Sequence, residues 1–215
     1  MASFVFDETK PRKIQVRNVR LSYPHLFKKQ IKTDDDGNVS EGAYSAMAIL
    51  DKKEHAAAIK KIEDAVGLAA ANAKWGADGE KVYNALRKQD KVFLRDGDDK
   101  FDKNGDPVPE LAGKMFFNAS SYAAKPSVFD RVKGPDGKAV KLTEEDGKPY
   151  AGCYVNIIIE GYGQDHKKHG RRINAGLTGV QFWADGEPLG GGVAASEDEF
   201  EYAEEEDADD LDFVA

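Results

Sequence analysis

The stretch "RRINAGLTGVQFW", residues 171–183, decides the fold that we expect for this chain. Apolar residues alternate along both of its halves but change parity in the middle: Ile173, Ala175 and Leu177, then Val180 and Phe182. Alternation is typical of a strand with one buried face. The change across Gly179 predicts one extra residue, a β-bulge, which bends a strand and helps a sheet to close.

The same change of parity occurs near the N-terminus, in "KIQVRNVRL". Ile14 and Val16 share one face of the expected strand, whereas Val19 and Leu21 share the other. Two strands that each change face are difficult to place in a flat sheet, because a bulge increases the local bend and twist. The predicted fold class is therefore mainly β, with a small, strongly curled antiparallel barrel.

Turn signals separate further strands. Asp-Gly occurs six times, and such pairs suit tight hairpin turns because they tolerate positive φ. Alternation predicts strands at "CYVNIII" (153–159), "KMFFNASSY" (114–122) and "SVFDRVK" (127–133). The last of these turns through "GPDG" into "KAVKLT", which predicts a hairpin.

One segment has helical periodicity instead. From Glu54 to Trp75, apolar residues recur at spacings of three and four among Lys and Glu, although Gly67 costs about 1 kcal/mol relative to Ala. A shorter helix is predicted over roughly 79–88. We therefore expect a helical insertion over about 54–88 that packs on the outside of the barrel.

Charge is divided unevenly along the chain. Residues 197–215 hold 11 Asp and Glu and no Lys or Arg, which leaves 28 acidic against 31 basic residues in 1–196, a net charge of +3. Such asymmetry is typical of nucleic-acid contact or of an interaction tail, and a purely solubilising tail is the alternative. We predict one domain, residues 1–195, and a disordered acidic interaction tail, residues 196–215.

The sequence gives no sign of secretion or membrane insertion. Cys153 is the single cysteine, so an intramolecular disulfide is excluded and a reducing compartment fits. No targeting segment is visible, and no apolar run approaches the roughly 20 residues that cross a bilayer. We expect a cytoplasmic protein, in the host cell if the chain is encoded by a phage.

Patterns for metal binding and catalysis are incomplete. A calcium loop around Asp102 fails because Lys100 and Leu111 stand where acidic ligands are needed. His166 and His169 lack further ligands nearby, and neither a nucleophile elbow nor a phosphate loop is present. We predict no metal, no cofactor and no catalytic residue, so the chain is not expected to be an enzyme.

Basic residues interleaved with aromatic residues are the remaining signal. Proteins that bind single strands without sequence preference use cations to follow the phosphates and ring faces to stack on bases. Any one strand aromatic is more often a core residue, so the argument rests on the set. The predicted DNA-binding residues are Lys13, Arg17, Arg20, Tyr23, Phe116, Tyr122, Lys125, Tyr154, Tyr162, Lys167, Lys168, Arg171 and Arg172.

The acidic tail ends with apolar residues that solubility alone does not require. Its polyanion is expected to compete with DNA for the cationic groove at high effective concentration. When DNA displaces the tail, its apolar side chains become available to a pocket on a partner protein. The predicted partner-binding residues are Asp209, Asp210, Leu211, Asp212 and Phe213.

Three blocks of the sequence, together with the tail, resemble the single-stranded-DNA-binding proteins of tailed bacteriophages. The blocks are "NASSYAAKPSVFD" (118–130), "YAGCYVNIIIEGYG" (150–163) and "INAGLTGVQFWADGEPLGGG" (173–192). The resemblance implies an OB-fold barrel that coats single-stranded DNA during replication, recombination or repair. It also implies a tail that recruits replication proteins such as a polymerase or helicase-primase, and self-association, for example as a homodimer. In this chain Val214 and Ala215 follow Phe213, so the ring is not terminal.

Alternative functions remain open from the sequence. The chain is an adaptor or DNA mimic if the acidic tail occupies the cationic site of another protein. It is a general DNA-binding protein if the body, with its net charge of +3, also holds duplex DNA through phosphates. It is a nucleic-acid-processing enzyme if it degrades DNA with a metal ion.

Overall fold

Residues 2–33, 37–167 and 169–189 are described by the computed structural model. Within this part of the chain, strands dominate, and nine of them form one sheet while β3 and β4 form a separate hairpin. The strands are β1 (Phe4–Phe6), β2 (Lys13–His25), β3 (Ile31–Thr33), β4 (Val39–Glu41), β5 (Tyr44–Asp51), β6 (Leu94–Asp96), β7 (Lys114–Ser121), β8 (Ser127–Lys133), β9 (Ala139–Lys141), β10 (Tyr154–His166) and β11 (Gly170–Ala184).

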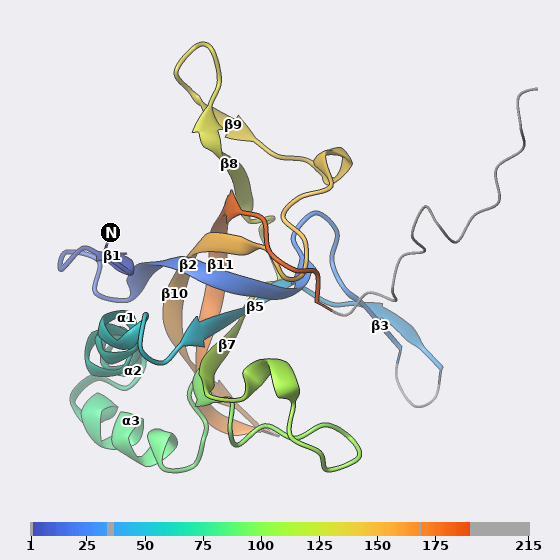
Figure 1. Cartoon of the computed structure of the whole chain (residues 1–215). Coiled ribbons are helices and arrows are strands. Elements are labelled where there is room, and N and C mark those ends of the chain that lie inside the picture. Colours follow the sequence, from blue (N-terminus) through green and yellow to red (C-terminus); the bar gives the residue numbers. More distant parts are fainter. Residues whose placement is uncertain (1, 34–36, 168, 190–215) are drawn as a thin grey trace, which may run out of the picture.

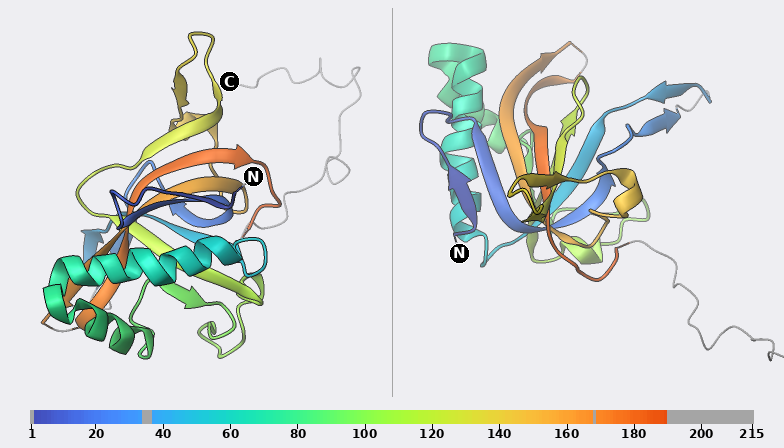
Figure 2. Two further views of the ribbon diagram at one scale, coloured as in Figure 1. Left: turned by 90° about the vertical axis from the view of Figure 1, so that its left-hand side faces the viewer. Right: turned by 90° about the horizontal axis from the view of Figure 1, so that it is seen from above.

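Five of these strands close into a barrel (Figures 1 and 2). The order around the barrel is β7–β5–β2–β10–β11, and β11 returns to β7. Neighbouring strands are antiparallel except at the closure, where Ala175 and Gly176 pair in parallel with Ala119 and Ser120. Five strands in this Greek-key order are the topology of an OB-fold, so the predicted fold class is confirmed.

Both predicted bulges are present. In the β10–β11 pair, Ile158 lies opposite Gly179 but Ile159 lies opposite Leu177, so Thr178 is the extra residue. The residues on either side of this bulge therefore keep their apolar side chains in the same core.

The second bulge lies in β2. Opposite β10 the register jumps from Val19 to Val16, and Asn18 adopts a positive φ of 54°. Ile14, Val16, Val19 and Leu21 are all buried, although they change parity along the strand. The bulge is what allows one strand to face the core along its whole length as it bends around the barrel.

The predicted helical insertion is also confirmed. It consists of α1 (Ala56–Lys61), a π-helical turn (Ile62–Val66), α2 (Gly67–Trp75) and α3 (Gly79–Arg87). Figure 2 shows the helices along one side of the barrel. Their buried residues belong to the same core cluster as the barrel strands: Ala58, Ile62, Val66, Ala70, Ala71, Tyr83 and Leu86.

Two glycines of β10 make room for α2. A β-carbon on Gly161 would lie 3.2 Å from the side chains of Val66 and Ala70. At Gly163 it would lie 2.6 Å from the Cβ of Lys74. The helix therefore packs against bare strand backbone, so the apolar face of the insertion extends the barrel core instead of covering a polar outer surface.

Two hairpins project from the barrel, β3–β4 and β8–β9 (Figure 1). The β8–β9 pairing, with Lys133 opposite Ala139, confirms the predicted hairpin. Short 3₁₀ turns complete the described chain at Gly76–Asp78, Pro109–Leu111 and Glu144–Asp146. Among the described helices, none is both long and apolar enough to cross a membrane.

The last described residues form a strap over the start of β10. The N–H of Leu189 donates to the carbonyl of Ala151 at 2.9 Å. A β-carbon on Gly152 would meet the Glu187 oxygen, so glycine is needed for this close approach, and its φ is +103°. The chain from residue 190 onward, including the predicted tail residues, lies outside the described residues.

Candidate nucleic-acid interface

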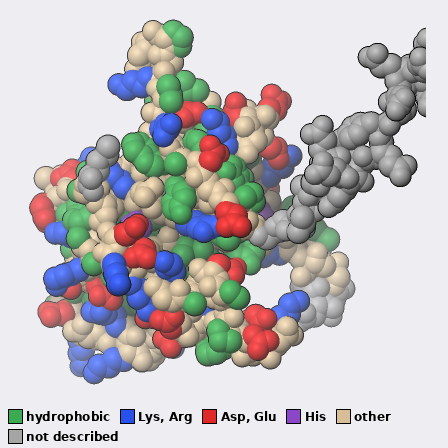
Figure 3. Space-filling model, viewed as in Figure 1, with side chains coloured by type: hydrophobic (Ala, Val, Ile, Leu, Met, Phe, Trp, Pro, Cys, Tyr) green, Lys and Arg blue, Asp and Glu red, His purple; other side chains and the backbone are tan. Residues whose placement is uncertain are grey.

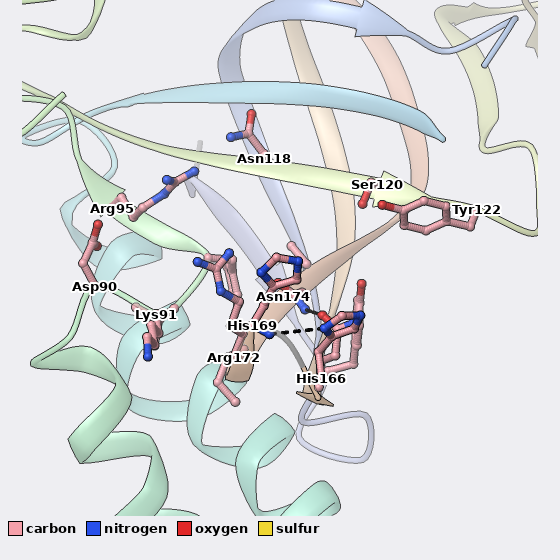
Figure 4. Close-up of a pocket in the computed structure, with 16 residues that line it drawn as sticks. Asp90, Lys91, Arg95, Asn118, Ser120, Tyr122, His166, His169, Arg172 and Asn174 are labelled. Carbon is pink, nitrogen blue, oxygen red and sulfur yellow. Dashed lines mark hydrogen bonds between the residues drawn. The ribbon is translucent and has the colours of Figure 1, made fainter. Parts of the chain in front are cut away.

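A polar hollow of about 480 Å³ opens on the outer side of the barrel where β7 meets β11 (Figure 4). We call it the β7–β11 groove. Segment 90–95, β7 and the outer ends of β10 and β11 form its walls. Its lining residues are Asp90, Lys91, Val92, Phe93, Arg95, Asn118, Ser120, Tyr122, Tyr162, Gln164, His166, His169, Arg172, Ile173, Asn174 and Ala175.

Strand alternation places polar side chains in the groove. On β7, Phe117 and Ala119 are fully buried in the core, so Asn118 and Ser120 point to the opposite face. On β10, Gly161 and Gly163 face α2, so Tyr162 and Gln164 face outward. The polar wall of the groove is therefore the reverse side of the same strands that build the core.

Two tyrosine rings lie in the groove. Tyr122, which directly follows β7, is 62% exposed. Tyr162 is half-buried and its ring lies beside Gly176, whose missing side chain leaves the ring uncovered on that side. Burial raises the pKa of the Tyr162 phenol above its ordinary value. The Tyr162 phenol therefore stays neutral near pH 7. The exposed face of either tyrosine ring is a surface on which a base can stack.

Three cationic side chains line the same groove. Arg172 and Lys91 line the groove and form no ion pair within the described residues. Arg95 also lines it, with its guanidinium 4.9 Å from the ring centroid of Phe116. Asp90 is the single carboxylate among the lining residues.

The connection between β10 and β11 adds two histidines. The rings of His166 and His169 are stacked with centroids 4.7 Å apart, and the His169 N–H donates to His166 Nδ1 at 3.2 Å. Figure 4 shows both histidines together with Arg172 among the residues that line the groove. Among the described residues, no group of three or more His, Cys, Asp and Glu side chains is arranged to hold a metal ion.

Several predicted DNA-binding residues come together here. Tyr122, Tyr162 and Arg172 line the groove. Lys167 is exposed on the same connection, and Arg171 is half-exposed, with its side chain near Asp165 at 3.4 Å and above the ring of Trp75 at 5.8 Å. Lys168 lies outside the described residues.

The prediction for Phe116 is wrong. Its side chain is 1% exposed and packs with Ile49 and Leu111, and with the partly buried Leu189. The outward face of β5 and β7 would be open at this point in a bare barrel. Here the turn at Leu111 and the end of the strap cover it, so the Phe116 ring is not available for stacking.

Arg20 and Tyr154 lie away from the groove. Both line a separate small hollow beside Asp51 and Lys114. Arg20 donates from Nη2 to the carbonyl of Glu187 at 2.8 Å, so its guanidinium holds the strap. Tyr154 is half-buried at the opposite end of β10 from Tyr162.

Lys13 and Arg17 also lie outside the groove, on the outer face of β2. Tyr23 is 64% exposed at a positive φ of 45°, near the end of that strand. The ammonium of Lys125 lies 5.4 Å from the ring centroid of Phe27. None of these four residues is among those that line the groove.

Sequence reasoning missed Arg95, Asn118 and Asn174 as lining residues. Asn118 occupies an outward position within a strand that was predicted correctly, so its direction was available from the alternation. Arg95 carried no such signal, because β6 has only three residues. Its place in the groove depends on the pairing of β6 with β7.

Comparison with known proteins gives the family. Residues 12–212 match the family described as Enterobacter phage Enc34, ssDNA-binding protein. The putative protein p50 of Acyrthosiphon pisum secondary endosymbiont phage 1 is 38% identical over 201 residues, which cover 91% of this chain and 97% of that protein.

Solved structures that are similar to this chain point to the same family. The single-stranded DNA-binding protein from bacteriophage Enc34 in complex with ssDNA matches with a TM-score of 0.66 and 28% identity, covering 88% of this chain and 95% of that chain. A C-terminal truncation of the Enc34 protein matches with a TM-score of 0.64 and 28% identity, over 88% of this chain and 94% of that one. The predicted resemblance to phage single-stranded-DNA-binding proteins is confirmed, and the chain belongs to the family of the Enterobacter phage Enc34 ssDNA-binding protein.

Proposed function

We propose that this chain binds single-stranded DNA without sequence preference, with the β7–β11 groove as its main contact, and that it serves phage DNA replication, recombination or repair in the cytoplasm of the infected cell. The proposal concerns binding, with no chemical step. It is supported by the Enc34 relative, whose structure in complex with ssDNA covers most of this chain.

The observation that carries the proposal is the combination of ring faces and cations in one open hollow. Tyr122 and Tyr162 offer stacking surfaces, while Arg172, Lys91 and Arg95 offer positive charge to phosphates. The groove also has the location that OB-folds use. They bind oligonucleotides on the second and third strands, which here are β5 and β7, and at the connection between the fourth and fifth, which here are β10 and β11.

The polar groups in the groove suit nonspecific recognition. Asn174 donates from Nδ2 to Gln164 Oε1 at 2.8 Å, so these two amides partly satisfy each other. A base stacked on a ring needs no particular hydrogen-bonding edge, because every base has a ring face. Figure 3 shows basic and acidic side chains interspersed on the outer surface of that view, which fits a body with a small net charge.

We propose in addition that residues 196–215 form an interaction tail that competes with DNA for the basic surface. Its 11 acidic residues are complementary in sign to the cations of the groove. Asp209, Asp210, Leu211, Asp212 and Phe213 would then recruit replication proteins, such as a polymerase or helicase-primase, once DNA displaces the tail. Self-association as a homodimer belongs to the same proposal.

Fluorescence anisotropy with labelled oligo-dT and a matched duplex tests the main proposal. We expect the full chain to bind the single strand more tightly than the duplex, with affinity that falls linearly on a log–log plot against salt. Equal affinity for the two would instead indicate a general DNA-binding protein. No binding to either, with or without the tail, would overturn the proposal and favour an adaptor that acts through its acidic tail.

A further inference from the structure

A second concave surface lies on the outer side of the barrel, formed by β2, β10 and β11 with β8 at its edge. Gln15, Asn156 and Gln181 lie at its centre and are shared by two adjoining hollows. We call this surface the amide face. It contains Lys13 and Arg17, two of the predicted cations that do not line the β7–β11 groove.

Hydrogen bonds between strands make the amide face rigid. Asn156 Oδ1 accepts the backbone N–H of Asn18 at 3.0 Å, and Asn156 Nδ2 donates to Gln181 Oε1 at 2.9 Å. Gln181 Nε2 donates to the carbonyl of Asp130 at 3.3 Å. The side chains thus connect β2, β10, β11 and β8, and a surface held in this way needs no ordering when a ligand binds.

Two half-buried aromatic rings border the amide face. Trp183 lines the hollow beside Arg17, and Phe129 lines the adjoining hollow beside Ile158. Each ring presents part of its surface to solvent. Tryptophan and phenylalanine in such positions can accept a stacked base.

The charge of this surface favours an anion. Lys13 forms no ion pair within the described residues, and the Arg17 guanidinium donates from Nε to Gln15 Oε1 at 3.4 Å. Glu160, at one edge, is neutralised by Arg12 at 2.7 Å, and Asp130 lies 3.0 Å from Lys148. Glu54 is the single carboxylate among the residues that line the two hollows.

The amide face continues directly from the groove. Tyr162, Glu160, Ile158 and Asn156 are alternate residues of β10 and share its outward side. Tyr162 lies in the groove and Asn156 in the amide face. Six residues of strand separate them by about 20 Å. Opposite this path β11 contributes Gly176 and Gly179, which have no side chain to obstruct it.

We infer that the amide face is a second contact region for the same DNA strand, which runs from the β7–β11 groove along the outward side of β10. Lys13 and Arg17 contact phosphates, and Trp183 and Phe129 stack on bases. This inference rests on the proposed function. It predicts that a short oligonucleotide occupies the groove alone, whereas a longer one also engages the amide face.

The test compares two lengths of labelled oligo-dT, about 6 and about 16 nucleotides, near the two ends of the range for one OB-fold. The variant is the double substitution Lys13→Gln and Arg17→Gln in the full chain. Its matched control is Lys81→Gln with Lys138→Gln, two exposed lysines on α3 and in the β8–β9 turn. Arg172→Gln serves as the groove variant.

We expect the double variant to bind the longer oligonucleotide at least about 5-fold more weakly and the shorter one normally. Its log–log salt slope for the longer strand should fall by about 1.4, since each lost contact with a single strand contributes about 0.7. The control pair of substitutions should leave the affinity for both oligonucleotides and the salt slope unchanged. Trp183→Leu tests the stacking contact without removing a charge. The affinity for the longer oligonucleotide should fall, while the salt slope stays the same.

Three results separate the possible failures. If Arg172→Gln weakens binding but the Lys13 and Arg17 variant binds the longer strand with normal affinity and slope, the inference is overturned and the proposed function stands. If a second, labelled oligonucleotide binds the amide face while a long strand saturates the groove, the two surfaces hold two separate DNA strands. That result would overturn the inference of one continuous strand. If the unaltered chain binds neither length, the proposed function itself fails.

Discussion

The ring of Tyr83 packs directly on Gly67, so closely that a β-carbon on Gly67 would lie 2.6 Å from the Tyr83 Cζ. The Tyr83 hydroxyl also donates to the carbonyl of Glu63 at 2.7 Å. This contact joins α3 to the long helix of the insertion. It explains a glycine in a helix where propensity alone would favour alanine.

Gly67→Ala should therefore destabilise the protein by about 1–3 kcal/mol, because the added methyl group displaces the Tyr83 ring. Helix propensity alone predicts a gain of about 1 kcal/mol. Urea unfolding followed by circular dichroism distinguishes the two. The control is Ala73→Gly at an exposed position of the same helix, which measures how much helix propensity alone changes the free energy of unfolding. An increase in the free energy of unfolding for Gly67→Ala would show that the contact does not constrain the helix.

Asn156 is a second position where one side chain connects distant segments. Replacing it with Ala removes the acceptor for the Asn18 N–H and the donor to Gln181. Because Asn156 is buried, we expect a loss of about 1–3 kcal/mol in the free energy of unfolding. Asn84→Ala, on the exposed side of α3, should change it by less than about 0.5 kcal/mol. Similar values for the two variants would contradict a structural role for the amide.

Cys153 is fully buried, and burial raises the pKa of its thiol to about 11. The thiolate is the reactive form, so the native protein should remain unlabelled by a thiol-specific disulfide reagent at pH 8. The same protein in concentrated urea should be labelled stoichiometrically. Fast labelling of the native protein at pH 8 would show that the start of β10 opens readily.

The same shift predicts the effect of alkaline pH on stability. The folded-state pKa of Cys153 lies above its ordinary value of 9.0, so its stabilising contribution is present below about pH 9 and is lost as the pH rises towards 11. Burial raises the pKa of Tyr83 to about 12, which acts in the same direction. The free energy of unfolding should therefore fall between pH 9 and 11, and less steeply for Cys153→Ala. An equal slope in both proteins would assign the loss to other groups.

Tyr122 is the more exposed of the two tyrosines in the β7–β11 groove. Tyr122→Ala should weaken binding of oligo-dT about 5- to 150-fold, the equivalent of one lost base stack of about 1–3 kcal/mol. The salt dependence should not change, because no charge is removed. Phe101→Ala is the control, since Phe101 is 50% exposed on a loop outside the groove. Equal effects of the two substitutions would argue against stacking at Tyr122.

Removing the tail tests the proposed competition. A chain of residues 1–196 keeps the strap that ends at Leu189 and loses all 11 acidic residues of the tail. We expect it to bind oligo-dT more tightly than the full chain, most clearly at low salt, where attraction between the tail and the groove is least screened. The difference should shrink towards about 1 M salt, where the screening length is about 3 Å. Equal affinity at low salt would exclude this competition.

Much of the fold could be predicted because each signal is local. The parity change at Gly179 predicted a bulge, since only an extra residue keeps both halves of one strand facing a core. The spacing of apolar residues between Glu54 and Trp75 predicted the helix in the same way. The candidate site was less predictable. Tyr122, Tyr162 and Arg172 line one groove, but Lys13 and Arg17 lie on another surface and Arg20 holds the strap.

Phe116 and Phe117 show that the sequence pattern predicts the face to which a strand side chain points but not whether that face is covered. They are adjacent on one strand, so alternation requires that they point to opposite faces, and Phe117 faces the core. Phe116 would then be a free outer ring. It is buried because it belongs to a cluster with Ile49 and Leu111, against which Leu189 of the strap also packs. No local pattern encodes a contact between segments so far apart along the chain.

By itself the sequence determined the mainly β class, the two bulges, the helical insertion and the separation of charge between body and tail, because hydrophobic periodicity and charge are written residue by residue. Only the tertiary structure decided which outward side chains share a surface. Barrel closure at Ala175 and Gly176 brings β7 beside β11 and so creates the groove, and the coverage of Phe116 removes one ring from the outer face. Both depend on the pairing of distant segments, which is fixed by the packing of the whole barrel.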